Sequence, residues 1–138
     1  MSAQFTSRGR TVTEADVVAF AALTGDWHPQ HSDAVWAAQS SFGERIAHGM
    51  LIVSLAVGLV AFDPGRVVAL RRVRDVVFKR PVRLGDTIRV ESTETEQRDV
   101  DGETALVTWN WRILNQDGDL VCRVTIEALV REPAEVVA

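Results

Sequence analysis

Apolar residues are spaced differently in the two halves of the chain, and this predicts a helical first half and a strand-rich second half. Over residues 13–25, an apolar stripe at helical spacing is formed by Val17, Phe20, Ala21 and Leu23. Thr13 is a typical N-cap with acidic residues after it, and Gly25 is a typical helix end. A second, shorter helix is expected over residues 32–39.

Residues 49–62 form the most apolar stretch of the chain, which only Ser54 and Gly58 interrupt. These two residues lie four apart and therefore on one face of a helix. A helix that is apolar on nearly all sides must be enclosed by other elements. The stretch is shorter than the roughly 20 residues that cross a bilayer, so we expect no membrane partner.

Beyond Gly65, apolar and polar residues alternate with the period of two that is typical of strands. The alternation predicts strands at residues 67–79, 88–93, 107–113 and 120–130. Asp101-Gly102 and Asp117-Gly118 are hairpin signals, so the last three strands should form an antiparallel meander. A further short strand is expected within residues 5–11.

These elements predict an α+β fold in a single domain over residues 1–138. An antiparallel sheet of about five strands, with one apolar face, is available to wrap around the one long apolar helix. A helix enclosed by a curved sheet in this way is the hot-dog arrangement. Because such a sheet leaves open edges, we expect two copies to pair edge to edge as a homodimer.

Composition and charge narrow the class of protein. With 138 residues, 46% of them apolar and 25% charged, the chain has the size and composition of one globular domain. A net charge of −4 argues against a nucleic-acid partner. The single cysteine, Cys122, excludes an intrachain disulfide framework, and the N-terminal residues lack an apolar signal core. We therefore expect a cytoplasmic protein.

The densest polar chemistry lies between residues 26 and 48 and includes all three histidines. It consists of Asp26, His28, His31, Asp33 and His48. Pro29 disfavours helical geometry at His28, so the first part should be a loop. The residues could be ordinary turn, cap and surface groups. A metal site would instead use His28 and His31 with a third ligand, which would be Asp26 or His48.

A third interpretation is an acid–base site that pairs Asp26 with His31. A loop lets both side chains face one water molecule, and the carboxylate then orients the imidazole. His48 and Gly49 directly precede the apolar helix, where free backbone N–H groups can hold a developing oxyanion. Gly49 also lets a ligand approach closely. With an apolar slot beside it, this arrangement suits an acyl thioester.

Two stretches of sequence carry a family resemblance. Residues 24–33 have the sequence Thr-Gly-Asp-Trp-His-Pro-Gln-His-Ser-Asp, and residues 42–51 have the sequence Phe-Gly-Glu-Arg-Ile-Ala-His-Gly-Met-Leu. Together they resemble the MaoC-like dehydratases, which include the (R)-specific enoyl-CoA hydratases. The resemblance extends from about residue 11 to the Pro-Val-Arg-Leu-Gly-Asp turn at residues 81–86, and more loosely to the C-terminus.

The resemblance implies a hot-dog homodimer that reversibly adds water to a 2-enoyl thioester, a hydro-lyase reaction of fatty acid metabolism. Asp26 and His31 would be the catalytic pair that holds and activates the water. The backbone N–H of Gly49 would bind the thioester oxygen. The resemblance implies no metal and no separate cofactor, because coenzyme A or the phosphopantetheine of an acyl carrier protein is part of the substrate.

The chain departs from the family pattern at two positions. His28 replaces the usual asparagine, and it is expected to reshape the pocket or to add a third titrating group there. Of two serines often found on the buried helix, Ser54 matches the first, but Val57 stands at the second. The residues expected to contact substrate are His28, His48, Ser54 and Trp27.

Other functions are compatible with the same fold. A hot-dog thioesterase would direct the activated water at the thioester carbonyl, and an amine-adding variant would replace water by an amine. A non-catalytic subunit that binds acyl thioesters within a heteromeric hydratase is a further alternative. Asp26 and His31 are both present, which favours an enzyme.

Basic residues are concentrated between residues 66 and 89. They are Arg66, Arg71, Arg72, Arg74, Lys79, Arg80, Arg83 and Arg89. Such a run is either a solvated strand face or a dock for the phosphates of coenzyme A or the acidic surface of an acyl carrier protein. The sequence leaves both interpretations open.

Overall fold

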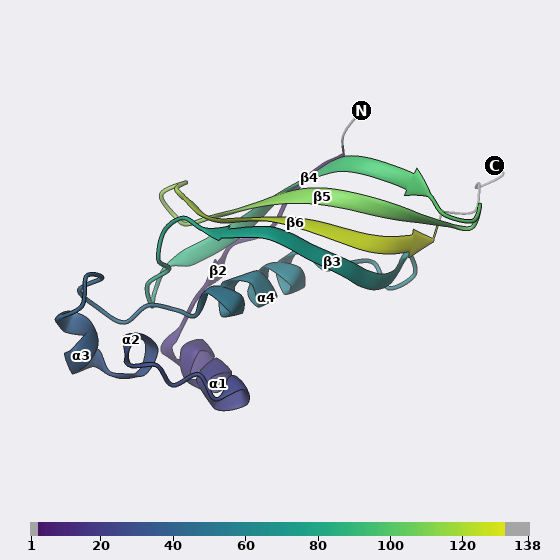
Figure 1. Cartoon of the computed structure of the whole chain (residues 1–138). Coiled ribbons are helices and arrows are strands. Elements are labelled where there is room, and N and C mark those ends of the chain that lie inside the picture. Colours follow the sequence, from purple (N-terminus) through teal and green to yellow (C-terminus); the bar gives the residue numbers. More distant parts are fainter. Residues whose placement is uncertain (1–2, 132–138) are drawn as a thin grey trace.

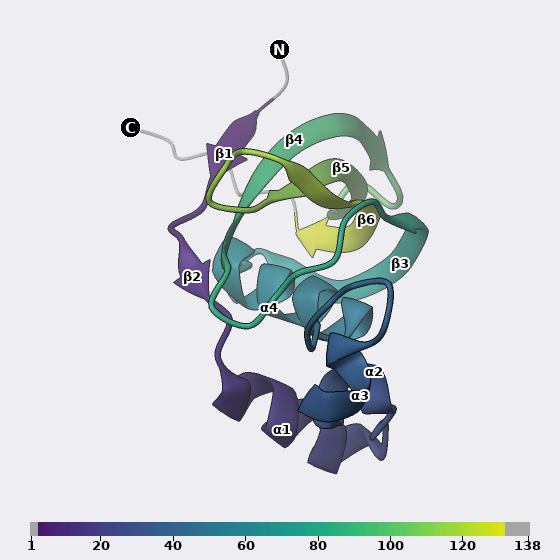
Figure 2. The same cartoon turned by 90° about the vertical axis from the view of Figure 1, so that its left-hand side faces the viewer.

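A strongly curved antiparallel sheet wraps around helix α4 (Gly49–Val60) in the computed structural model, which describes residues 3–131 (Figures 1 and 2). The strands are β1 (Gln4–Thr6), β2 (Arg10–Thr11), β3 (Val67–Phe78), β4 (Thr87–Asp99), β5 (Thr104–Leu114) and β6 (Leu120–Arg131). Their order in the sheet is β1-β4-β5-β6-β3, and β2 also pairs with β4. Helices α1 (Glu14–Thr24), α2 (Pro29–Ser32) and α3 (Ala34–Ala38) lie on the α4 side of the sheet (Figure 1).

The predicted hot-dog arrangement is confirmed, as is the meander of β4, β5 and β6. The sheet has six strands rather than about five, because the segment expected to form one short strand forms both β1 and β2. The ladder is interrupted at Ser7, whose hydroxyl replaces a backbone acceptor for the Val90 N–H at 2.8 Å. Residues 1–2 and 132–138 of the expected domain lie outside the described residues.

The core lies between α4 and the concave face of the sheet. The helix contributes Leu51, Ile52, Val53, Ala56 and Leu59, all of which are buried. The strands contribute their largest buried side chains, which include Ile88, Trp111, Ile113 and Ile126. These inward positions follow the period-two alternation, so the pattern along each strand encodes the core face.

One side of α4 remains exposed, contrary to the expectation that the helix is enclosed all round. Met50, Ser54 and Gly58 lie on this side, and Met50 is 56% exposed. The helix also ends at Val60, two residues earlier than predicted, since Ala61 adopts the left-handed conformation with φ of 53°. One side of this apolar helix therefore packs in the core, and the other side is exposed to solvent.

Local signals set the boundaries of the helices. Thr13 and Asp16 form a capping box at the start of α1, and Gly25 ends that helix with φ of 81°. The segment after Gly25 is not a loop throughout, because residues 29–32 form the helical turn α2. Pro29 occupies its first position, where a missing N–H costs nothing, and His28 is the N-cap, whose side chain accepts the Gln30 N–H.

Strand β3 forms one edge of the sheet. Val68, Leu70 and Val73 on this strand are between 41% and 47% exposed. An exposed edge strand of 12 residues offers unpaired backbone groups for pairing with another strand. The expected edge-to-edge homodimer stays a prediction. No helix among residues 3–131 is long and apolar enough to cross a membrane.

Candidate active site

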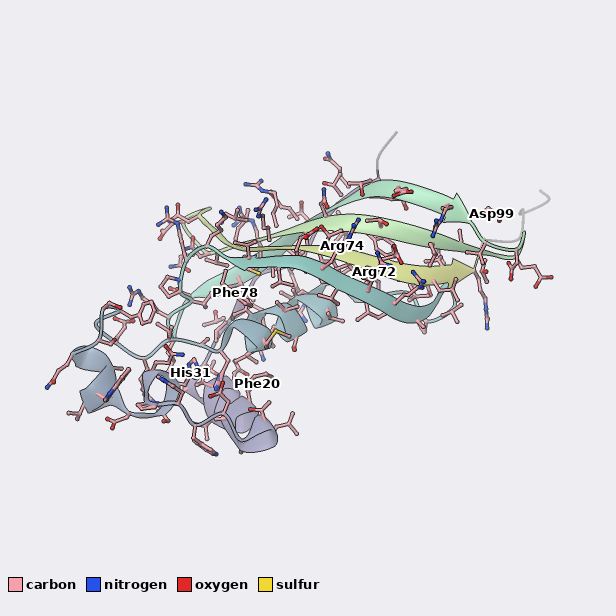
Figure 3. All side chains as sticks on the ribbon, viewed as in Figure 1. Phe20, His31, Arg72, Arg74, Phe78 and Asp99 are labelled. Carbon is pink, nitrogen blue, oxygen red and sulfur yellow. The ribbon has the colours of Figure 1, made fainter. Side chains whose placement is uncertain are left out.

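A cavity of about 520 Å³ opens where the start of α4 meets α2 and the end of β3. Four residues of the predicted site line it: Asp26, His31, His48 and Gly49. Figure 3 shows His31 and Phe20 below the end of β3 that carries Phe78. The structure thus brings together the acid–base pair and the expected oxyanion donor. Most of the remaining wall is apolar, as an acyl chain requires.

His31 is positioned by the segment that precedes α4. The Ile46 N–H donates to the Gln30 carbonyl at 3.0 Å, and His31 Nδ1 lies 2.7 Å from the Ile46 carbonyl oxygen. Ala47 in turn donates to the Val82 carbonyl at 2.8 Å, so the segment is held on its other side as well. The imidazole is buried and fixed at the wall of the cavity.

These contacts determine the tautomer of His31. A carbonyl oxygen only accepts, so the proton is on Nδ1, and Nε2 carries the lone pair, which the Gln30 amide nitrogen approaches at 3.3 Å. Burial lowers the pKa of His31, and the nearby His48 lowers it further, while the Ile46 carbonyl and Asp26 act in the opposite direction. A neutral imidazole with an accepting Nε2 is the form that a general base requires.

Asp26 lies beside this nitrogen on the same wall of the cavity. Its Oδ2 is 3.9 Å from His31 Nε2, which is too long for a direct hydrogen bond. One water molecule at about 2.8 Å from each atom would bridge the gap, because both atoms are acceptors and water has two O–H groups. The carboxylate is half exposed, and its Oδ1 accepts the His28 N–H at 3.3 Å.

Gly49 is the first residue of α4, and His48 provides no side-chain cap there. Within the described residues, the Gly49 N–H has no hydrogen-bond partner. A Cβ at this position would lie 2.7 Å from two ring atoms of Phe78, so any larger residue would have to displace that ring. The free N–H and the positive end of the helix dipole make this point of the cavity attractive to a developing negative charge.

Three side chains of the cavity are close enough together to be metal ligands. Asp26, His31 and His48 have potential ligand atoms within 4.8 Å of one another. The two imidazole rings, however, are stacked, with centroids 3.8 Å apart and planes at 27°. Their nitrogen lone pairs lie in nearly parallel planes, whereas two histidines on one zinc ion must converge on a point about 2.0 Å from each nitrogen. The stack therefore disfavours a metal.

Three predicted substrate contacts do not line the cavity. His28 caps α2 through Nδ1, which accepts the Gln30 N–H at 3.1 Å, and its ring packs edge-on against Trp36. Trp27 is 51% exposed. Ser54 is on the exposed side of α4, where its hydroxyl donates to the Met50 carbonyl at 2.8 Å. Their roles in substrate binding stay predictions.

Other residues of the cavity were not singled out as site residues from the sequence. Gln30 places its amide 3.3 Å from His31 Nε2, and Phe78 covers Gly49. Lys79 and Arg80, from the basic run, also line the cavity. Phe78, Lys79 and Arg80 reach the site from the end of β3, far from the polar segment in the chain, and the basic run was the sequence signal for the last two.

Comparison with known proteins identifies relatives along most of the chain. The family model of the MaoC like domain matches residues 2–114. Protein MaoC of Klebsiella aerogenes is 44% identical over 110 residues, which are 75% of this chain and 32% of that protein. The (R)-specific enoyl-CoA hydratase of Aeromonas caviae is 38% identical over 120 residues, which are 86% of this chain and 85% of that protein. The chain therefore spans less than a third of Protein MaoC and most of the hydratase.

Solved structures agree with this result. An Archaeoglobus protein described as a monoamine oxidase regulatory protein superposes with a TM-score of 0.91 at 37% identity, covering 97% of this chain and 92% of that one. A Mycobacterium tuberculosis protein with a double hot-dog fold superposes with a TM-score of 0.86. At 19% identity, over 99% of this chain and 44% of that one, it supports the fold alone. The chain belongs to the MaoC-like domain family and has the hot-dog fold.

Proposed function

We propose that this chain reversibly adds water to the double bond of a 2-enoyl thioester to give a 3-hydroxyacyl thioester. As a member of its family, the chain is a hydratase or dehydratase, which is a hydro-lyase. The observation that carries the finer proposal is the gap of 3.9 Å between Asp26 Oδ2 and His31 Nε2, two acceptors on one wall of an otherwise largely apolar cavity.

The pair acts on one bridging water. Asp26 and neutral His31 each accept one of its O–H groups, which leaves an oxygen lone pair to attack the β-carbon. The thioester oxygen gains enolate charge and is stabilised by the Gly49 N–H at the start of α4. A proton taken from the water by the pair is balanced by the proton that the α-carbon receives. The two proton transfers occur on the same face, and the product has the R configuration.

The basic residues at the cavity support an anionic carrier. Lys79 and Arg80 line the cavity, and both of their side chains are exposed. Their backbone N–H groups donate to the Val121 carbonyl, so the backbone at both residues is held in place next to the cavity. By contrast, Arg71 in the same run is paired with Glu127 at 2.6 Å. We propose that Lys79 and Arg80 face the phosphate of coenzyme A or of a phosphopantetheine arm.

The homodimer is part of this proposal. Edge pairing through β3 would cover Val68, Leu70 and Val73. Sedimentation measures the mass in solution, and Val73→Asp should shift it towards the monomer, because a charge at a strand pair is costly to bury. A location in the cytoplasm stays a prediction.

The direct test is an assay with crotonyl-CoA and longer 2-enoyl-CoAs, followed by loss of absorbance of the conjugated thioester and by product mass. Asp26→Asn and His31→Ala should each lower kcat by about 100-fold or more. Asp33→Asn is the matched control, because Asp33 caps α3 and does not line the cavity, and asparagine caps equally well.

Product mass separates this proposal from its alternatives. Addition of 18 mass units to the enoyl thioester indicates hydration, whereas free thiol from a saturated acyl-CoA indicates hydrolysis, and an amine adduct indicates the amine-adding variant. Turnover that needs a second hot-dog chain indicates a heteromeric subunit. If wild-type protein consumes no enoyl thioester on any carrier tested, the proposed function is wrong.

A further inference from the structure

His48 contacts both members of the proposed catalytic pair. Its Nε2 lies 2.9 Å from the backbone carbonyl oxygen of Asp26, to which it donates. Its ring stacks on the ring of His31 with centroids 3.8 Å apart. Phe20 packs edge-on against the His48 ring, with centroids 5.0 Å apart. The His48 side chain is 2% exposed, so these contacts are shielded from solvent.

The bond to Asp26 joins two segments that are distant in sequence. Residues 25–27 make their other hydrogen bonds within the described chain to partners between residues 20 and 32. The His48 bond ties the same turn to the start of α4, where Gly49 offers its N–H. One imidazole therefore fixes the carboxylate-bearing turn relative to the proposed oxyanion donor.

One nitrogen of His48 has no partner. Nδ1 is buried, and no described residue hydrogen-bonds to it. Burying an unpaired polar atom is unfavourable. Phenylalanine or glutamine in place of His48 would each avoid part of the cost of burying Nδ1. Phenylalanine stacks on His31 but donates nothing, and glutamine donates but has no ring. Imidazole is the side chain of this size that does both, which explains why the unpaired nitrogen is retained.

We propose that His48 is a positioning residue, which holds Asp26 by a hydrogen bond and His31 by stacking so that both face the same water. The assignment rests on the function proposed above. It gives His48 a role through its neighbours rather than through contact with the reacting atoms. Loss of either contact should lower kcat more than it raises KM for the enoyl thioester, because the basic residues and the apolar wall proposed to bind the carrier and acyl chain are unchanged.

Three variants separate the contribution of the hydrogen bond to Asp26 from that of the stacking on His31. His48→Phe keeps a ring against His31 and loses the donor, His48→Gln keeps a donor and loses the ring, and His48→Ala loses both. We expect kcat to fall about tenfold in each of the first two and about 100-fold in the third. Val107→Ala is the control for destabilisation, because Val107 is fully buried in a separate cluster and does not line the cavity. It should lower the thermal midpoint without changing kcat.

The titration of His31 provides a second readout, measured by NMR of the imidazole nitrogens. The charged or titratable groups near this ring are Asp26, His28 and His48. In His48→Phe the ring stays covered but His48 no longer disfavours its charge, so the pKa of His31 should rise and the acid limb of kcat should move to higher pH. A loss of folded protein would scale the rate equally at every pH.

The outcomes separate the two proposals. Wild-type kcat together with an unchanged His31 titration in His48→Phe and His48→Ala would overturn the positioning role. If wild-type protein hydrates no enoyl thioester, the proposed function fails, and the His31 titration still decides whether His48 positions the pair. A fall in kcat with a shifted acid limb, and no such shift in Val107→Ala, supports the assignment.

Discussion

Replacing Gly49 by alanine tests the close packing at the start of α4. The added Cβ would lie 2.7 Å from two atoms of the Phe78 ring, whereas ordinary contacts begin near 3.4 Å. The ring must therefore move by at least about 0.7 Å. Phe78 is 50% exposed, so its side chain can swing away from the helix.

The effect on stability should be small. Displacing a half-exposed ring costs on the order of 1 kcal/mol of burial, and alanine in place of glycine in a helix returns up to about 1 kcal/mol. The effect on catalysis should be large, because the new methyl group lies beside the N–H that we propose to receive the thioester oxygen. We expect kcat/KM for crotonyl-CoA to fall about 100-fold, which corresponds to about 2.7 kcal/mol.

Gly58→Ala on the same helix is the matched control. A Cβ there meets nothing within 4 Å, so this variant should gain about 0.5–1 kcal/mol of stability and keep wild-type kcat/KM. In the double variant Gly49→Ala/Phe78→Ala, the rate should recover only in part, since the methyl group still narrows the approach to the N–H. Hydration rates and urea unfolding measure the two effects. Wild-type kcat/KM in Gly49→Ala would refute the proposed oxyanion site.

Three further predictions concern titrating groups. Because burial lowers the pKa of His31, kcat/KM should fall with acid only below the ordinary histidine pKa of 6.5. Folded His31 binds fewer protons than unfolded His31, so the stability that it contributes is present above pH 6.5 and is lost as the pH falls through the folded-state pKa. Urea unfolding as a function of pH measures this loss. The hydrogen bond from Arg10 lowers the pKa of Asp16 far below its usual range. Asp16→Asn should therefore lower the free energy of unfolding by about 1 kcal/mol near pH 7 and leave it unchanged in strong acid. Equal losses at both pH values would contradict this explanation. Burial raises the pKa of the Cys122 thiol to about 11, so a disulfide reagent at pH 8 should label it only after unfolding, and rapid labelling of folded protein would show that the strand is more open than described.

Elements with local causes could be predicted from the sequence. The capping box at Thr13, the left-handed Gly25 and the glycine turn at Gly118 depend on a few neighbouring residues, and the structure has all three. The strands could be predicted because alternation determines which face of each is buried. The turn α2 was missed for a local reason as well, because Pro29 restricts His28 but also suits the first position of a helix.

The candidate site divides in the same way. Asp26, His31 and Gly49 could be proposed from their residue types and spacing, and all three line one cavity. Phe78 on Gly49 and the bond from His48 to Asp26 join segments that are distant in sequence, so no spacing rule predicts them. Ser54 was predicted to contact substrate but lies on the exposed side of α4, outside the cavity. An apolar helix does not by itself reveal which of its sides the sheet will cover.

The sequence by itself determined where most of the helices and strands lie, which strand face is apolar, and which groups could hold a water and an oxyanion. These properties follow from backbone conformation and hydrophobic periodicity within a few residues. Only the tertiary structure decided the gap of 3.9 Å between Asp26 and His31, the tautomer and lowered pKa of His31, and the exposed side of α4. Each of these depends on contacts between distant segments, whose geometry is set by packing of the whole fold.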